Sequence, residues 1–162
     1  MLQRETNRKP ELVGSTKRMR ADEERETACQ LTMTIPADPA AIPRVTNAVT
    51  QVLAERTWPE DDVMAVELAL TEALANAIRH GCHGDVNRDV RCSVTCDESD
   101  ELVIVVRDPG SGFDPDAVPD PLDSANTLNP SGRGIFLMHG LMDHVRFADG
   151  GREVRMRKRR GL

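Results

Sequence analysis

Two polar residues, Glu72 and Asn76, lie four positions apart in the segment ELALTEALANAIRHG, residues 67–81. On an α-helix this spacing places a carboxylate and an amide on one face, one turn apart. A carboxylate can act as a general base, and an amide oxygen can bind a hard cation such as Mg²⁺. The same pair could also be no more than the solvated polar edge of a helix, so its meaning depends on other segments of the chain.

An aspartate followed by two glycines ends a predicted strand later in the chain. The segment reads RDPGSGFDP from Arg107 and contains Asp108, Gly110 and Gly112. A side chain at a strand end can project into a pocket, and glycines let the backbone approach a ligand without a Cβ atom in the way. Prolines and a lack of periodicity predict a long, lid-like loop over Pro109–Pro130.

A second glycine segment, SGRGIFLM, covers residues 131–138. We expect Gly132, Arg133 and Gly134 to precede a helix that begins near Ile135. The free N–H groups at a helix N-terminus suit phosphate oxygens. Together with the carboxylate and the amide of the earlier helix, the two glycine segments could hold a magnesium nucleotide.

Residue periodicity predicts the elements that position these groups. We expect strands near residues 29–35, 90–96, 102–106, 145–147 and 154–156, and helices near 42–53, 60–81 and 135–142. The helix that carries Glu72 should end at Gly81 in a left-handed cap. We expect one domain over 29–158, after a disordered extension at 1–28 and before a basic tail at 159–162.

The charge of the chain is unevenly distributed. Of 21 basic and 27 acidic side chains, residues 1–28 hold seven and six, and residues 152–160 hold six and one, which leaves eight and twenty in 29–151. An acidic body repels a phosphate backbone, so we expect no direct nucleic-acid binding. It also contains no lysine, which excludes a Walker A loop. No apolar run approaches the roughly 20 residues of a membrane helix, so we expect no membrane contact.

The four cysteines, Cys29, Cys82, Cys92 and Cys96, show neither CxxC spacing nor the density of a disulfide scaffold. We therefore expect a reducing, cytoplasmic setting. Cys92 and Cys96 should be small core residues on one strand face.

Two metal sites are weaker alternatives. His80, Cys82 and His83 offer ligand types that zinc prefers, but a fourth ligand and a usual spacing are missing. The aspartates from Asp108 to Asp116 are still less like a calcium loop, because the order DxDxDG is absent.

Three phrases in order, EALANAIRHG, RDPGSGFDP and SGRGIFLM, resemble the N, G1 and G2 boxes of the GHKL ATPase superfamily. The resemblance covers roughly residues 29–158. Within the superfamily the chain is most similar to stand-alone bacterial anti-sigma-factor serine-protein kinases, because it is short and carries the phrases TEAxxNAIxHG and GxGFDP. The resemblance implies a Bergerat-type α/β two-layer sandwich, with a mixed, largely antiparallel sheet and helices on one face.

The resemblance also implies catalytic roles. Glu72 would be the general base that accepts the proton of an attacking hydroxyl group. Arg133 would stabilise the charge that develops during transfer, and Asn76 would bind Mg²⁺. Arg79 and His80 would be accessory residues or simply helix-end residues.

The remaining matched residues would bind ATP. Asp108 would accept the adenine amino group, and Gly110 and Gly112 would allow the adenine and the lid to pack closely. Gly132 and Gly134 would hold the β- and γ-phosphates together with the arginine between them. Two positions depart from relatives: Arg152 stands where many have threonine, and Pro130 stands where some serine kinases have arginine.

The implied function is an ATP-dependent serine/threonine-protein kinase that acts as an anti-sigma factor. It would phosphorylate an anti-anti-sigma partner and sequester a sigma factor, and a homodimer is left open. One alternative is a nucleotide-dependent binding module without efficient phosphotransfer. Another is the detached ATP-binding part of a histidine kinase, although no phosphoacceptor helix is present in this sequence.

Overall fold

The computed structural model describes residues 27–114 and 130–161. Residues 1–26 of the predicted extension therefore lie outside the described residues, and so do residues 115–129 of the predicted lid. No helix of the described part is long and apolar enough to cross a membrane.

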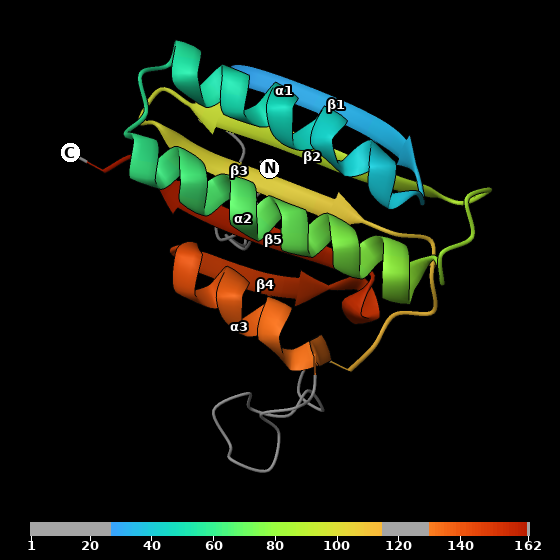
Figure 1. Ribbon diagram of the computed structural model, residues 1–162. Coiled ribbons are helices and arrows are strands. Elements are labelled where there is room, and N and C mark those ends of the chain that lie inside the picture. Colours follow the sequence, from blue (N-terminus) through green and yellow to red (C-terminus); the bar gives the residue numbers. More distant parts are fainter. Residues whose placement is uncertain (1–26, 115–129, 162) are drawn as a thin grey trace, which may run out of the picture.

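Five strands form a single sheet, which is one layer of the molecule (Figure 1). They are β1 (Thr27–Pro36), β2 (Asp89–Asp97), β3 (Glu101–Arg107), β4 (His144–Ala148) and β5 (Glu153–Arg159). Their order is β1-β2-β3-β5-β4, and every neighbouring pair is antiparallel. The predicted strands and both predicted hairpins are confirmed. The described strands contain no parallel pair, so the sheet is antiparallel throughout rather than mixed.

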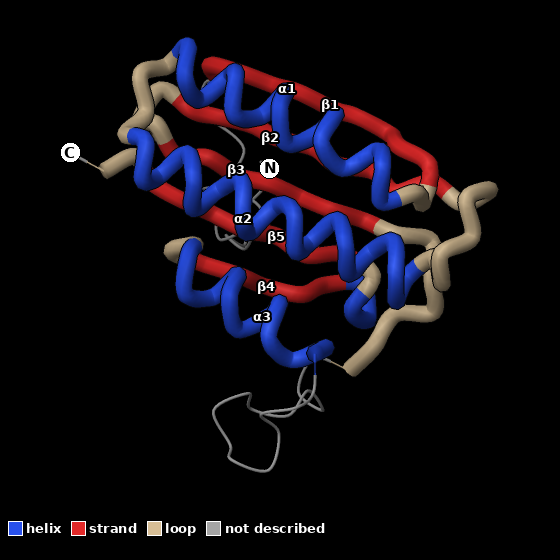
Figure 2. The backbone as a smooth tube through the Cα atoms, in the orientation of Figure 1, coloured by secondary structure: helices blue, strands red, loops and turns tan. Residues whose placement is uncertain are grey.

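Three helices form the second layer and cover one face of the sheet (Figure 2). They are α1 (Ile42–Glu55), α2 (Glu60–Asn76) and α3 (Pro130–Leu141). Short turns complete the described elements: 3₁₀ turns η1 (Pro39–Ala41) and η4 (Asp149–Gly151), and a π-helical turn η2 (Ala77–Gly81). The α/β two-layer sandwich predicted from the sequence is confirmed.

The core between the layers is aliphatic, as the low aromatic content requires. Helix α2 lies between α1 and α3 and buries Leu70 and Leu74 completely, while Ile104 of β3 and Met156 of β5 are buried on the sheet side. Full burial of each such side chain contributes roughly 1.5–3 kcal/mol. The position of α2 over the sheet is therefore well fixed.

The end of α2 differs from the prediction. Gly81 is not a left-handed cap, since it is absent from the described glycines with positive φ. Instead, the Cys82 N–H group donates to the Ala77 carbonyl oxygen at 2.9 Å, an i→i−5 bond that makes the last turn π-helical. A π-helical turn inside a helix often marks a functional site.

The start of α3 also differs from the prediction. The helix begins at Pro130 rather than near Ile135, so Gly132 and Gly134 lie in its first turns. Proline is well tolerated at the first position of a helix. The two glycines were expected to precede the helix, but packing against α2 overrides their low helix propensity.

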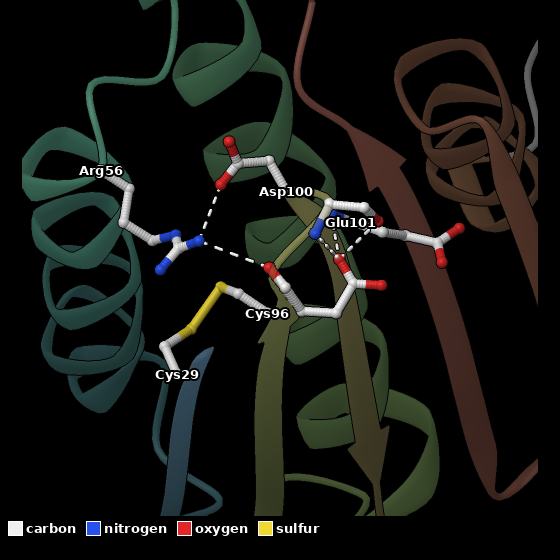
Figure 3. Close-up of a disulfide and its surroundings, with 7 residues drawn as sticks. Cys29, Arg56, Cys96, Asp100 and Glu101 are labelled. Atoms are coloured by element: carbon white, nitrogen blue, oxygen red, sulfur yellow. Dashed lines mark hydrogen bonds and ion pairs between the residues drawn. A yellow bond between two sulfur atoms is a disulfide. The ribbon is translucent and has the colours of Figure 1, made fainter. Parts of the chain in front are cut away.

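A disulfide joins Cys29 of β1 to Cys96 of β2, which corrects the expectation for the cysteines (Figure 3). The two residues are directly opposite in the antiparallel register, with a Cα–Cα distance of 4.9 Å. Their sequence separation of 67 residues gave no sign of this pairing. Cys92 and Cys96 are both buried core residues on one strand face, as predicted, but Cys96 is bridged, whereas Cys92 is a free thiol. Burial raises the pKa of the Cys92 thiol to about 12.

Arg56 lies next to this disulfide and ties the end of α1 to the turn between β2 and β3 (Figure 3). Its Nη2 atom donates to Asp100 Oδ1 at 2.8 Å and to the Asp97 carbonyl oxygen at 3.4 Å. The hydrogen bond from Arg56 lowers the pKa of the Asp100 carboxyl group. The chain end is held at the same turn, because Arg160 Nη1 lies 3.1 Å from Asp100 Oδ2.

We expect Cys29→Ser to lower the free energy of unfolding under oxidising conditions by about 4 kcal/mol, the chain-entropy estimate for a loop of this length. The measurement is urea unfolding with and without a reductant. In reductant, the wild type should unfold at nearly the same urea concentration as the variant. A wild-type midpoint that does not respond to the reductant would show that the bond is not formed.

Candidate functional site

A cavity of about 420 Å³ lies between α2, α3 and the adjoining ends of β3, β4 and β5. Its walls are largely apolar and include Ala73, Val106, Ile135, Met138 and Val154. A few polar side chains also line it: Asn76, His80, Asp108, Asp114 and Arg152. An apolar cavity of this size with a few convergent polar groups is typical of a small-molecule site.

Asp108 lies at one end of the cavity, directly after β3, as predicted. Its N–H group donates to the Arg152 carbonyl oxygen at 3.0 Å, and its Oδ1 atom accepts from the Gly110 N–H group at 2.8 Å. A methyl group at Gly81 would overlap the Asp108 carboxyl group. Close approach, rather than a left-handed conformation, is therefore what requires glycine at position 81.

The Asp108 carboxyl group is partly withdrawn from water. Burial raises its pKa, and the Gly110 N–H group, Arg152 and His83 act in the opposite direction. No described residue donates a hydrogen bond to its Oδ2 atom. This oxygen is thus an acceptor beside an apolar cavity, suited to an amino group of a ligand.

Glu72 and Asn76 lie together on α2 and face the first turns of α3, as their spacing predicts. A Cβ atom at Gly134 would lie 2.6 Å from Glu72 Oε2 and 3.3 Å from Asn76 Nδ2. Asn76 lines the cavity, and the half-buried Glu72 lies one turn further back on α2 and is absent from the lining. The missing side chain at Gly134 is what lets α3 approach these two groups.

Other predicted site residues do not line the cavity. Gly110 and Gly132 are buried outside its lining, and Arg133 is exposed on α3. Gly112 does line it and has a φ of +78°. Of the predicted site residues, Asn76, Asp108 and Gly112 therefore line the cavity, and the structure does not bring the Arg133 side chain into it.

Two aromatic side chains that the sequence did not single out also line the cavity. Phe113 and Phe147 both line the cavity and meet edge to face, with ring centroids 5.2 Å apart. The Phe113 N–H group donates to the Gly150 carbonyl oxygen at 2.9 Å, which fixes the start of the predicted lid. The position of Phe113 directly after Gly112, in a chain with only three phenylalanines, was the one signal available.

The alternative metal cluster does not form. Cys82 is completely buried, whereas His80 and His83 are exposed. Among the described residues, no group of three or more His, Cys, Asp or Glu side chains could hold a metal ion. Asp116, the last residue of the alternative calcium loop, lies outside the described residues.

A family model described as the histidine kinase-like ATPase domain matches residues 35–158. The chain belongs to this family. The resemblance to its anti-sigma-factor serine-protein kinases is confirmed by the relatives that it matches. Serine-protein kinase RsbW of Bacillus subtilis (strain 168) is 28% identical over 128 residues, which cover 75% of this chain and 79% of that protein.

Other relatives are also serine-protein kinases or anti-sigma factors by name. Serine-protein kinase RsbW of Bacillus licheniformis (strain ATCC 14580) is 30% identical over 83% of this chain and 88% of that protein. An anti-sigma F factor of Priestia megaterium is 33% identical over 53% of this chain and 60% of that protein. A crystal structure of RsbU and RsbW domains from Mycobacterium tuberculosis has a TM-score of 0.60 at 19% identity, over 82% of this chain and 33% of that one, and it supports the fold alone.

The raised pKa of Asp108 predicts a pH-dependent stability for this family member. A raised pKa means that the folded protein binds the proton more tightly than the unfolded chain, whose pKa is about 3.9. The stabilisation is therefore present below about pH 3.9 and is lost as the pH rises through the folded-state pKa. We expect Asp108→Asn, which can still accept the Gly110 hydrogen bond, to unfold at a higher temperature than wild type at neutral pH.

Thermal unfolding over a pH series measures this effect. The advantage of Asp108→Asn over wild type should shrink as the pH falls toward about 4, because wild-type Asp108 then becomes protonated in both states. A difference that stays constant across the series would contradict the proposed desolvation of this carboxylate.

Proposed function

We propose that the protein binds Mg-ATP in the cavity and transfers the γ-phosphoryl group to a serine or threonine of a protein partner. In this proposal the working unit is the domain over residues 29–158. The observation that carries the proposal is the convergence of Glu72 and Asn76 on Gly134 beside the cavity. The relatives named serine-protein kinase and anti-sigma F factor support the same reading.

The cavity residues fit a nucleotide. The Asp108 Oδ2 atom can accept a hydrogen bond from the adenine amino group, and the apolar walls can pack against the ring faces. Gly110 supports this end by holding Oδ1, so the carboxylate is oriented before a ligand binds. In the proposal, Gly112 lets the backbone pass close to the base, and Gly132 presents a free N–H group of the first turn of α3 to the phosphates. Gly134 leaves room for them beside Glu72 and Asn76.

The donor set also fits one magnesium ion. Asn76 supplies an amide oxygen, and Mg²⁺ usually takes few protein ligands together with phosphates and waters. Asn76 would hold the ion, which supplies charge neutralisation on the phosphates when bound. The absent Cβ atom at Gly134 leaves the room beside Asn76 that such a set requires.

Transfer needs a base and a group that stabilises negative charge. Glu72 would accept the proton of the attacking hydroxyl group while the new bond forms between its oxygen and the γ-phosphorus and the bond to ADP breaks. Arg133 would stabilise the charge on the transferred group. Because its side chain is exposed outside the cavity, this role requires that it turn toward the ligand.

The proposed partners are an anti-anti-sigma protein as the phosphorylated substrate and a sigma factor as the sequestered protein. Both act on transcription, so the proposal includes a cytoplasmic location. In that compartment the bond between Cys29 and Cys96 would form only under oxidation. The second candidate function is a nucleotide-dependent binding module without efficient transfer, which the position of Arg133 outside the cavity favours.

We expect ATP to bind with a dissociation constant of about 1–100 μM in the presence of Mg²⁺. Asp108→Asn should weaken binding at least about tenfold, because a charged acceptor becomes a neutral one. Isothermal titration calorimetry with and without magnesium is the measurement. No heat and no thermal shift at millimolar ATP would refute the proposal at its first step.

We expect Glu72→Gln to bind ATP like wild type but to transfer phosphate about 10²–10⁴-fold more slowly, the usual contribution of a positioned base. Glutamine keeps the size of the side chain and one acceptor but cannot take the proton. Asn76→Ala should impair both binding and transfer. The assay follows radiolabelled γ-phosphate into a candidate anti-anti-sigma protein, with acid stability of the product as the sign of phosphoserine or phosphothreonine.

Glu67→Gln is the matched control, because Glu67 is an exposed glutamate on the same helix. It should transfer phosphate at the wild-type rate. Equal rates for Glu72→Gln and wild type would remove the catalytic role of Glu72. A wild-type protein that binds ATP and a sigma factor but labels no partner would favour the binding module, and an acid-labile product would favour the histidine kinase alternative.

A further inference from the structure

The face of the sheet that carries no described helix is rich in arginine. Along β5, every second residue points away from the helices, and these residues are the exposed Arg155, Arg157 and Arg159. Neighbouring strands add three more exposed arginines on the same face, Arg91, Arg107 and Arg146. This surface contrasts with residues 29–151, which hold 20 acidic and eight basic side chains.

Acidic residues pair with three of the six arginines, Arg107, Arg155 and Arg159. Glu101 and Glu153 are buried beneath the arginines, with side chains only 10% exposed. Arg155 Nε lies 2.6 Å from Glu153 Oε1, and Arg159 Nε lies 3.6 Å from Glu101 Oε1. Arg107 also pairs with Asp149, and Asp89 and Asp97 of β2 share the face, so the unpaired positive charge is that of Arg91, Arg146 and Arg157.

The strand register places like charges opposite one another. Arg146 of β4 is opposite Arg155 of β5, and Arg91 of β2 is opposite Arg107 of β3. Like charges directly opposite in a sheet are destabilising. Within the described part of the chain, no ion pair compensates Arg91, Arg146 or Arg157. The opposite partners Arg107 and Arg155 are themselves ion-paired with Asp149 and Glu153, so the charge available to an outside anion is that of Arg91, Arg146 and Arg157.

Apolar side chains accompany the arginines. Val103 and Val105 of β3 are half-buried on the same face and lie opposite Arg157 and Arg155 of β5. A surface that combines cations with half-buried aliphatic groups suits a polypeptide, which offers both carboxylates and apolar side chains.

We propose that this basic sheet face, made of the six arginines with Val103 and Val105, binds an acidic segment of a protein partner. Along β5 the arginines lie about 7 Å apart and span about 14 Å, and a strand with alternating acidic residues repeats at the same distance. A nucleic acid would extend past so small a surface onto the acidic remainder of the molecule, where its phosphates are repelled. The surface lies on the opposite side of the sheet from α2 and α3, so it is separate from the nucleotide cavity.

The test uses the full chain without nucleotide and a fluorescein-labelled peptide that alternates glutamate and serine. We expect fluorescence anisotropy to show binding at low salt that weakens as the salt concentration rises. The double variant Arg146→Gln, Arg157→Gln should bind about tenfold more weakly. The control variant Arg44→Gln, Arg88→Gln removes two exposed arginines elsewhere and should bind within about twofold of wild type.

A folding control accompanies the binding measurement. The Arg146 and Arg157 variant should unfold at or above the wild-type temperature, because it removes a repulsion from the sheet. A peptide that alternates glutamine and serine should not bind.

The proposal is overturned if wild type does not bind the acidic peptide, or if the two double variants lose affinity equally. It is also overturned if a short oligothymidylate binds as tightly as the peptide and depends on the same arginines, since the surface would then be a nucleic-acid site. Peptide binding by this face goes beyond the proposed kinase function. ATP titration of the same variants tests the two proposals separately. Loss of peptide binding with intact ATP binding concerns only the basic sheet face.

Discussion

The packing of the Asp108 carboxyl group against Gly81 is the contact on which the site depends. It joins the end of the central helix to the end of β3, and the hydrogen bond from the Asp108 N–H group to Arg152 extends this connection to β5. The same helix carries Glu72 and Asn76, so one rigid element sets both ends of the cavity. The cost is a carboxylate partly removed from water, which the Gly110 N–H group offsets only in part.

Helix α2 can position both ends of the cavity because its other side is buried in the core. Leu70 and Leu74 are completely buried, and they alternate along the helix with the groups that face α3. Gly134 then brings α3 close enough for Glu72 and Asn76 to meet its first turns. The two groups proposed to act in catalysis, Glu72 and Asn76, are thus held by packing before any ligand arrives, which is the condition for efficient positioning.

Sequence periodicity predicted the elements well, because alternation and helical spacing are local properties. It located the strand that ends at Asp108 and the shared face of Glu72 and Asn76. It failed where contacts between distant residues decide the structure. Gly81 is glycine because of a carboxylate 27 positions later, and Cys96 is bridged because of a strand register. Likewise, α3 begins early because it packs against α2. The residues around Gly134 give no local sign of this contact.

The π-helical turn at Ala77–Gly81 makes chain length itself part of the site. Its i→i−5 bond encloses one residue more than an α-helical turn, and each residue rotates an α-helix by about 100°. Deletion of a single residue here would restore regular helix but present a different side chain to Asp108. No amino-acid substitution reproduces that rotation. Among related sequences, a one-residue gap in this short segment would therefore mark proteins that keep the fold but have lost the cavity.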